Sequence, residues 1–156
     1  MSQAAQMTIT SANAVFTLKV PGLYDAPVTI EGYGTDAAVN VADHTPAQVQ
    51  MGIDGHLSAG WTPTPKVITV TLAADSPSRV IFEDWEQYME TIREVLTCEA
   101  VFSLPSIGRR MTGTRGFLTQ SHKRPNANQV LQSSAFQITF EQFSGSNMPV
   151  GSLPSE

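Results

Sequence analysis

The chain has 156 residues, of which 41% are apolar and 15% are charged, and nine Lys and Arg against fourteen Asp and Glu give a formal net charge of −5. This length and composition indicate one domain with a hydrophobic core, and no apolar run approaches the eighteen or so residues that a membrane helix needs. The acidic balance argues against a protein that grips nucleic acid, and the low charged fraction suits a surface covered by partners.

The N-terminus and the cysteine count indicate a reducing compartment. The first ten residues lack the charged region, apolar core and cleavage site of a secretory signal, so we expect synthesis in a cytoplasm. Cys98 is the only cysteine, so it forms no internal disulfide, and we interpret it as a small buried apolar residue.

Alternating apolar residues predict strands before the middle of the chain. Residues 12–20 place Phe16, Leu18 and Val20 on one face, and residues 27–33 read as a second strand. Residues 47–53 predict a strand with Val49, Met51 and Ile53 facing inward, followed by a tight turn at Asp54-Gly55. Residues 60–66, with two prolines, predict a loop or an edge.

The pattern then passes from a central strand to a helix. Residues 66–75 place Ile68, Val70 and Leu72 on one face of a strand. Spacing of three and four residues predicts a helix over about 77–97, with Ser76 as its cap and Pro77 in the first helical position. Its apolar stripe consists of Ile81, Trp85, Tyr88, Met89, Ile92, Val95 and Leu96.

Three more strands are predicted after the helix. The last of them carries Phe136, Ile138 and Phe140 on one face, and the Gly-, Ser- and Pro-rich residues 144–156 predict a flexible tail. We therefore expect a single β domain over residues 1–143, with an N-terminal arm (1–12) and a long interaction region (34–65). The predicted fold is mainly β, a β-sandwich or open barrel of two packed sheets with one flanking α-helix.

No residue set in the sequence predicts catalysis. The motifs GxSxG and P-loop are absent, and the four residues that could converge on a metal, Asp43, His44, Asp54 and His56, read better as polar turn residues. We expect no enzymatic activity, no metal and no cofactor.

Five of the nine basic residues fall between Gly108 and Pro125: Arg109, Arg110, Arg115, Lys123 and Arg124. Residues 109–120 are one of the predicted strands, and the simplest interpretation of residues 120–125 is a solvated loop. The alternative pairs Arg109, Arg110 and Arg115 with an acidic ridge on the predicted helix, formed by Glu86, Glu90 and Glu94 at four-residue spacing. Between copies of the chain, such a contact would be head-to-tail and would build rings or filaments.

Trp61 lies between a glycine and a proline-containing loop. It reads either as an interface anchor, because tryptophan is enriched in binding hot spots, or as part of a loop that packs on the core. A third possibility is a soluble β domain that binds a small ligand or peptide, with Trp61 at the mouth of its site.

The segments SANAVFTLKVPGLYDAPVTIEGYGTD, MGIDGHLSAGWTPTPKVITVTLAADSPS, FEDWEQYMETIREV and LPSIGRRMTGTRGFLTQ…ITFEQF together resemble tail tube-like virion proteins of long, contractile-tailed bacteriophages. The resemblance covers roughly residues 11–143. Proteins of this kind are similar to the haemolysin-coregulated tube protein of type VI secretion.

The resemblance implies six subunits per ring, with rings stacked into a tube that serves as the conduit for DNA ejection. Implied partners are further copies of the chain and the tail sheath and baseplate proteins. Genomic DNA would pass through the lumen without specific binding, and no membrane insertion is expected. The implied location is the virion tail, after synthesis in the bacterial host cytoplasm. The same motifs fit a ring used once, as a tube initiator or terminator at the baseplate or the tail end.

Overall fold

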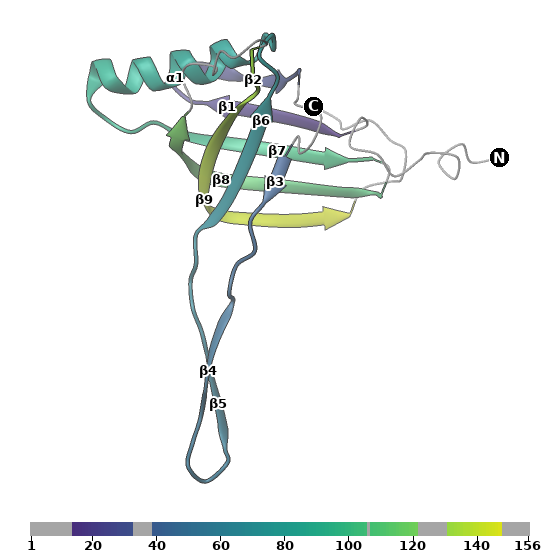
Figure 1. Ribbon diagram of the computed structural model, residues 1–156, viewed down its shortest axis with the longest axis vertical. Coiled ribbons are helices and arrows are strands. Elements are labelled where there is room, and N and C mark those ends of the chain that lie inside the picture. Colours follow the sequence, from purple (N-terminus) through teal and green to yellow (C-terminus); the bar gives the residue numbers. More distant parts are fainter. Residues whose placement is uncertain (1–13, 33–38, 106, 122–130, 148–156) are drawn as a thin grey trace, which may run out of the picture.

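The computed structural model describes residues 14–32, 39–105, 107–121 and 131–147. These residues form nine strands and one helix (Figure 1). In chain order the elements are β1 (Val15–Val20), β2 (Tyr24–Ile30), β3 (Val39–Val41), β4 (Ala47–Met51), β5 (Leu57–Trp61), β6 (Lys66–Leu72), α1 (Arg79–Ile92), β7 (Thr97–Leu104), β8 (Arg109–Ser121) and β9 (Ser134–Asn147). Among them, no helix is long and apolar enough to cross a membrane.

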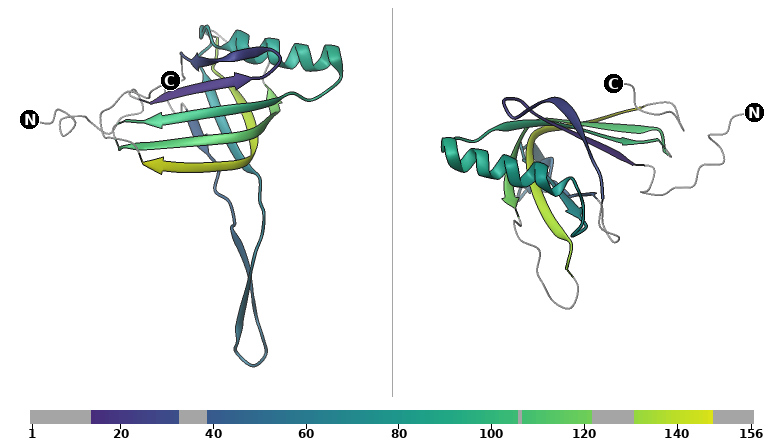
Figure 2. Two further views of the ribbon diagram at one scale, coloured as in Figure 1. Left: turned by 180° about the vertical axis from the view of Figure 1, so that it is seen from behind. Right: turned by 90° about the horizontal axis from the view of Figure 1, so that it is seen from above.

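Seven strands form one antiparallel sheet in the order β2-β1-β7-β8-β9-β6-β3, and β4 and β5 form a separate two-stranded sheet. The large sheet bends along its two longest strands, β8 and β9, so that β6 and β3 cross the direction of β1 and β7 (Figure 2). The first half of β9, Ser134–Phe140, pairs with β6, and its second half pairs with the start of β8. The predicted fold class is confirmed: the chain is mainly β with one flanking helix.

The bend coincides with an irregularity in β8. Cys98 and Ala100 of β7 are partnered with Gly116 and Gly113 of β8, so two residues of β8 occupy the place of one in β7. One of the two, Arg115, has φ of 51°. An extra residue of this kind increases local twist and bends the strand.

The core fills the inside of the bent sheet. Every second residue of β1, β6 and the first half of β9 is buried, as the alternation predicted: Phe16, Leu18, Val20, Ile68, Val70, Leu72, Phe136, Ile138 and Phe140. Cys98 is also buried and free, and burial with the nearby Glu99 carboxylate raises the pKa of its thiol to about 12. The prediction of Cys98 as a small core residue is confirmed.

The start of α1 differs from the prediction. The helix begins at Arg79 with Ser78 as N-cap, and neither Ser76 nor Pro77 occupies its predicted position. The two serine hydroxyls are used elsewhere: Ser76 Oγ donates to the carbonyl of Glu31, and Ser78 Oγ accepts from the Glu31 N–H at 2.7 Å. These bonds attach the segment before α1 to the end of β2. Ser76 Oγ also accepts from the Ser78 N–H at 3.3 Å, whereas the Ser78 side chain makes no capping bond to the helix.

The helix also ends earlier than predicted. Arg93 adopts the left-handed conformation and its N–H closes the last turn on the Met89 carbonyl, so Glu94 lies beyond the helix. Trp85 is fully buried, as expected. Tyr88, Ile92 and Val95 are instead 38%, 37% and 63% exposed, which contradicts their assignment to the core stripe. The end of the helix projects past the sheet in Figure 1, and this leaves its last turn without a covering strand.

The predicted chain ends are described only in part. The N-terminal arm (1–12) lies outside the described residues, as do residues 148–156. The strand β9 extends to Asn147, so Ser144–Asn147, the first residues of the predicted tail, pair with Arg109–Thr112 instead.

Candidate functional site

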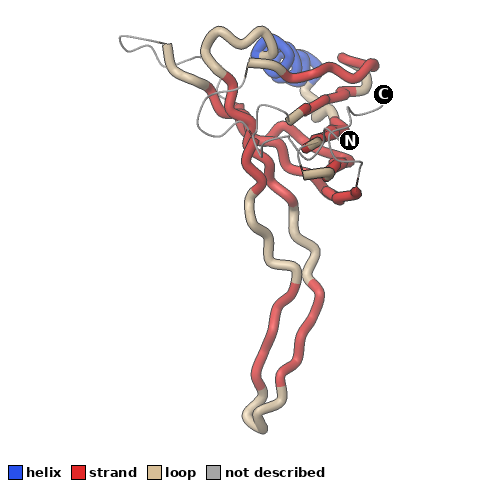
Figure 3. The backbone as a smooth tube through the Cα atoms, turned by 90° about the vertical axis from the view of Figure 1, so that its right-hand side faces the viewer, coloured by secondary structure: helices blue, strands red, loops and turns tan. Residues whose placement is uncertain are grey.

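A hairpin projects from the body of the molecule along its longest axis (Figure 3). It consists of β4 and β5, joined by the predicted turn, and the bond from the Thr62 N–H to the Pro46 carbonyl closes its base. The Asp54-Gly55 turn is confirmed: Gly55 has φ of 83°, and Asp54 Oδ1 accepts from the His56 N–H at 3.1 Å.

The two faces of the hairpin differ in chemistry. Residues directly opposite each other across two strands share a face. One face is wholly apolar and carries three cross-strand pairs, namely Ala47 with Trp61, Val49 with Ala59, and Met51 with Leu57. The other face carries Gln48 and Gln50 opposite Gly60 and Ser58. The hairpin is therefore amphipathic, with no charged side chain in either strand.

The apolar face meets solvent. Every residue of β4 and β5 is exposed, including Val49 at 64% and Trp61 at 78%, and Ile53 at the tip is fully exposed. The prediction that Val49, Met51 and Ile53 face inward is therefore wrong for the single chain, although Val49 and Met51 do share one face. Exposed apolar patches of this kind mark surfaces that bind a partner.

A pocket of about 380 Å³ lies where the hairpin leaves the body. Its lining is Trp61, Pro63, Thr64, Pro65, Lys66, Glu141 and Gln142. The Thr64 hydroxyl is buried without a hydrogen-bond partner among the described residues, and Lys66 Nζ donates to the Thr64 carbonyl at 2.7 Å. Trp61 thus lines a pocket that combines apolar side chains with Lys66 and Glu141, and it does not pack on the core.

The four residues considered for a metal do not converge. Asp54 and His56 lie at the hairpin tip, whereas Asp43 and His44 precede β4 at its root. No group of three or more possible metal ligands occurs in the described part of the chain.

The basic residues lie on β8. The Arg109 guanidinium donates to Asn147 Oδ1 at 2.9 Å, and Arg115 pairs with Glu141 at 3.3 Å with both side chains more than half exposed. Such exposed pairs contribute little to stability. Lys123 and Arg124 lie outside the described residues. The strand predicted here is observed over Arg109–Ser121, and residues 122–125 of the predicted loop (120–125) lie outside the described residues.

The acidic ridge is shorter than predicted. Glu86 and Glu90 lie on α1, but Glu94 follows the left-handed residue that ends the helix. Arg109 and Arg110 pair with the last residues of β7, whereas α1 leads into its first residue. The seven steps of β7 span about 23 Å, so this arginine pair and the end of the helix lie at opposite ends of the strand. Any contact between them would therefore involve two copies of the chain.

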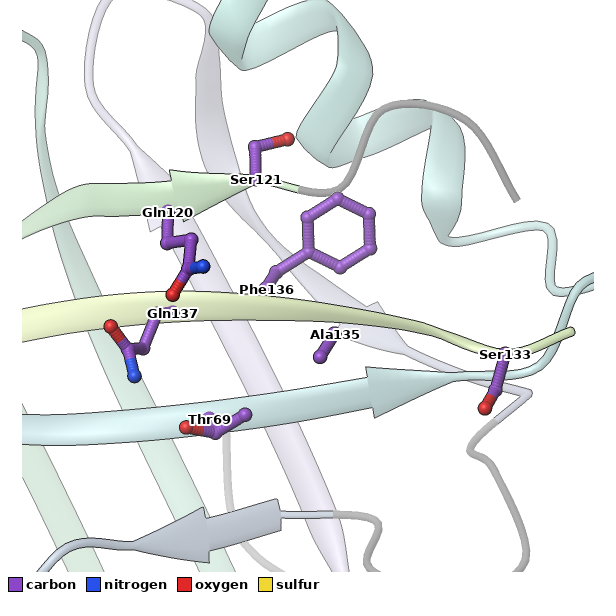
Figure 4. Close-up of a pocket in the computed structure, with 7 residues that line it drawn as sticks. All are labelled: Thr69, Gln120, Ser121, Ser133, Ala135, Phe136 and Gln137. Carbon is purple, nitrogen blue, oxygen red and sulfur yellow. The ribbon is translucent and has the colours of Figure 1, made fainter. Parts of the chain in front are cut away.

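A second, shallow pocket of about 250 Å³ lies on the outer face of β6, β8 and β9 (Figure 4). Figure 4 shows Thr69, Gln137 and Gln120 side by side, and each is a cross-strand neighbour of the next. This row is uncharged and contains no acid, base or nucleophile activated by a neighbour. The arrangement offers hydrogen bonding to a partner surface and no catalytic group.

Sequence reasoning missed the pocket at the hairpin root. Lys66 falls where the predicted loop or edge (60–66) meets the predicted strand (66–75), and nothing in the sequence links it to Glu141. The sequence signals only the hairpin beside it: β4 and β5 alternate apolar residues with no charged residue in either strand, and two prolines that no sheet interior accepts follow them.

Comparison with known proteins identifies a family and a fold. A family model described as "Tail fiber protein gp32" matches residues 7–144. No curated protein matches the sequence.

Three solved structures share the fold over more than 90% of both chains. A chain of the PVC sheath-tube complex of an extracellular contractile injection system, in the extended state, has a TM-score of 0.65 at 12% identity and covers 94% of this chain and 96% of its own. The anti-feeding prophage cap, a tube terminating cap, has a TM-score of 0.61 at 11% identity and covers 91% of this chain and 93% of its own. A chain of the anti-feeding prophage baseplate has a TM-score of 0.59 at 7% identity and covers 94% of this chain and 98% of its own. The resemblance to tube-like proteins is therefore confirmed at the level of the fold.

Proposed function

The chain belongs to the tail fiber protein gp32 family, and from this membership and its tube-like fold we propose that it is a structural subunit of a bacteriophage tail tube. Six copies would form a ring, and stacked rings would form the conduit for DNA ejection. Its location would be the virion tail, after synthesis in the host cytoplasm.

The observation that carries the proposal is the exposed apolar face of the hairpin. A lone subunit leaves Val49, Met51, Leu57 and Trp61 in water, together with Ile53 at the tip. Burial of an apolar side chain stabilises an interface by about 1.5–3 kcal/mol before the costs of association are counted. A protein that stacks against copies of itself removes this face from solvent.

Lateral contacts between subunits would use charge. Arg109, Arg110 and Arg115 on one copy would meet the acidic surface of Glu86, Glu90 and Glu94 on its neighbour. The separation of Arg109 and Arg110 from the end of α1 along β7 supports a contact between copies for these two. Arg115 lies beside the first residues of β7 and is paired with Glu141 of its own chain, so it would have to exchange that partner. Such pairs fix orientation more than they add affinity. The N-terminal arm (1–12) and the region 34–65 are the proposed contacts between rings.

The proposed partners follow from the same role. The surface of the tube would meet the tail sheath, and one end of the tube would meet the baseplate. Genomic DNA would pass through the lumen without specific binding, because a chain with a net charge of −5 has no overall electrostatic attraction to phosphate groups. The role requires no catalysis and no cofactor.

A second candidate is a ring used once, at the baseplate or the end of the tube. The cap and the baseplate chain share the fold nearly as well as the sheath-tube chain does. A repeated subunit needs its two ring faces to match each other, whereas a single ring needs one face to match a different protein.

The test is negative-stain electron microscopy of the purified protein, with light scattering across a salt series on the same sample. Stacked rings or tubes are the expected result, and closed single rings would favour the cap or baseplate role. A monomer at all concentrations would contradict self-assembly and favour the ligand-binding alternative, with the Trp61 pocket as its site.

A further inference from the structure

We propose that the hairpin tip of one copy seats in the pocket at the hairpin root of a second copy, with Ile53 against Trp61 and the two prolines and Asp54 beside Lys66. This contact deepens the proposed tube function, on which it rests, because it names the surfaces that join one ring to the next.

The tip has the form of a protruding knob. Ile53 is fully exposed, and the hydrogen bonds from the Gly55 N–H to the Gly52 carbonyl and from the Gly52 N–H to the His56 carbonyl hold the turn around it. An isoleucine presented on an ordered turn loses little conformational freedom when it binds, which favours association.

The pocket offers matching apolar lining residues. Trp61, Pro63 and Pro65 line it, and its volume of about 380 Å³ is ample for one branched aliphatic side chain and part of the turn that carries it.

Charges at the two ends are complementary. At the tip, Asp54 uses Oδ1 to accept from the His56 N–H, and a carboxylate retains further acceptor positions on its second oxygen. At the pocket, Lys66 Nζ donates to the Thr64 carbonyl and has two more N–H groups to offer. The other charged residue in the lining, Glu141, is already paired with Arg115. The pocket therefore presents a positive group where the tip presents a negative one.

The geometry requires two copies. The tip and the pocket lie at opposite ends of one hairpin, and the nine steps of extended chain from Leu57 to Lys66 cover roughly 30 Å at about 3.3 Å per residue. A contact between unlike surfaces of identical chains is heterologous, and repeated along one axis it builds an open stack. In that stack, the apolar face of each hairpin lies along the body of the next subunit.

A disulfide experiment tests the contact in the full-length protein. The double variant Ile53→Cys/Pro63→Cys is purified, scored for tubes by electron microscopy, and then oxidised. We expect a ladder of covalent multimers on a denaturing, non-reducing gel, because each chain supplies one tip and one pocket. Cys98 is buried and the pKa of its thiol is about 12, so the native cysteine stays silent.

The two single-cysteine variants are the matched controls, and neither should exceed a dimer. Dimers of Ile53→Cys alone, without a ladder in the double variant, would mean that tips meet tips and would overturn the proposal. Tubes without a ladder would overturn the contact and leave the tube function standing. A ladder without regular tubes would support the contact and count against the tube.

A charge variant supplies an independent readout. Asp54→Asn keeps an oxygen for the His56 N–H and removes the negative charge. We expect at least a threefold rise in the protein concentration needed for stacking at low salt, and a weaker dependence on salt than the wild type shows. Circular dichroism checks that the variant is folded. Unchanged stacking and unchanged salt dependence would overturn the pairing of Asp54 with Lys66.

Discussion

Gly113 and Gly116 lie on either side of the extra residue in β8, where the sheet bends. A Cβ atom on Gly113 would lie 2.8 Å from the Phe140 ring, and one on Gly116 would lie 2.8 Å from Cys98 Sγ and closer still to Phe140. Real Cβ atoms do not approach other atoms so closely. Both positions require glycine because the Phe140 ring occupies the space that a Cβ atom would fill and packs directly on the backbone of β8.

Replacement of Gly116 by alanine should lower the free energy of unfolding by about 1–3 kcal/mol, the usual cost of overpacking a core. Gly60→Ala is the matched control, because a Cβ atom at that exposed strand position meets nothing within 4 Å. We expect the control to stay within about 0.5 kcal/mol of the wild type. Urea denaturation followed by circular dichroism measures both, and equal stability of the two variants would contradict the packing argument.

The hairpin shows where sequence patterns succeed and where they stop. Alternation located β4, and Asp54-Gly55 located its turn, because both signals are local. The same alternation in β1 and in β4 had opposite outcomes: Phe16 is fully buried, whereas Val49 is exposed. An apolar alternation predicts that one face of a strand is buried, but it does not indicate whether the same chain or another chain covers that face. The pocket at the hairpin root could not be predicted, because it joins residues from β5, β6 and β9 that are up to 81 positions apart.

The helix limits were mispredicted for a related reason. The helix predicted from the spacing of its apolar residues is present as α1, and Ile81, Phe82 and Trp85 are buried against the sheet. Its ends depended on contacts that no local rule contains: the Ser76 and Ser78 bonds to Glu31 at the start, and the left-handed Arg93 at the end.

Removal of the hairpin should separate folding from assembly. With Ala47–Trp61 replaced by an Asn-Gly turn, the body should keep its melting temperature within about 5 °C, because no residue of β4 or β5 is buried. Stacking should be lost. Thermal melts and electron microscopy give the two readouts. A large fall in melting temperature would show that the hairpin stabilises the body, and normal tubes would exclude it from the ring contact.

The subunit carries positive and negative side chains at opposite ends of β7. Arg109 of β8 lies opposite Leu104, the last residue of β7, and Glu94 lies just before the first residue of β7. Copies arranged side by side in the same orientation can bring these ends together all the way round a closed ring. Exposed charges of this kind are screened beyond about 8–10 Å at physiological salt, so the contact should depend on ionic strength.

Arg109→Glu should weaken lateral association about tenfold, and Glu94→Lys added to it should restore part of the loss. Arg109→Gln is the control for the bond to Asn147, because glutamine keeps a donor and removes only the charge. Sedimentation velocity at two salt concentrations measures association. Failure of the second substitution to rescue the first would remove this pair from the ring interface without affecting the hairpin contact.

The hairpin is continuous with β6, and β6 pairs with β9 over seven residues, from Lys66 opposite Phe140 to Leu72 opposite Ser134. Hydrogen bonds in an antiparallel ladder run perpendicular to the strands. A pull on the hairpin along its own axis would therefore load all seven positions of the ladder at once, in shear, instead of opening them one by one. The joint between hairpin and body therefore resists tension applied along the hairpin, because no single position of the ladder can yield before the others.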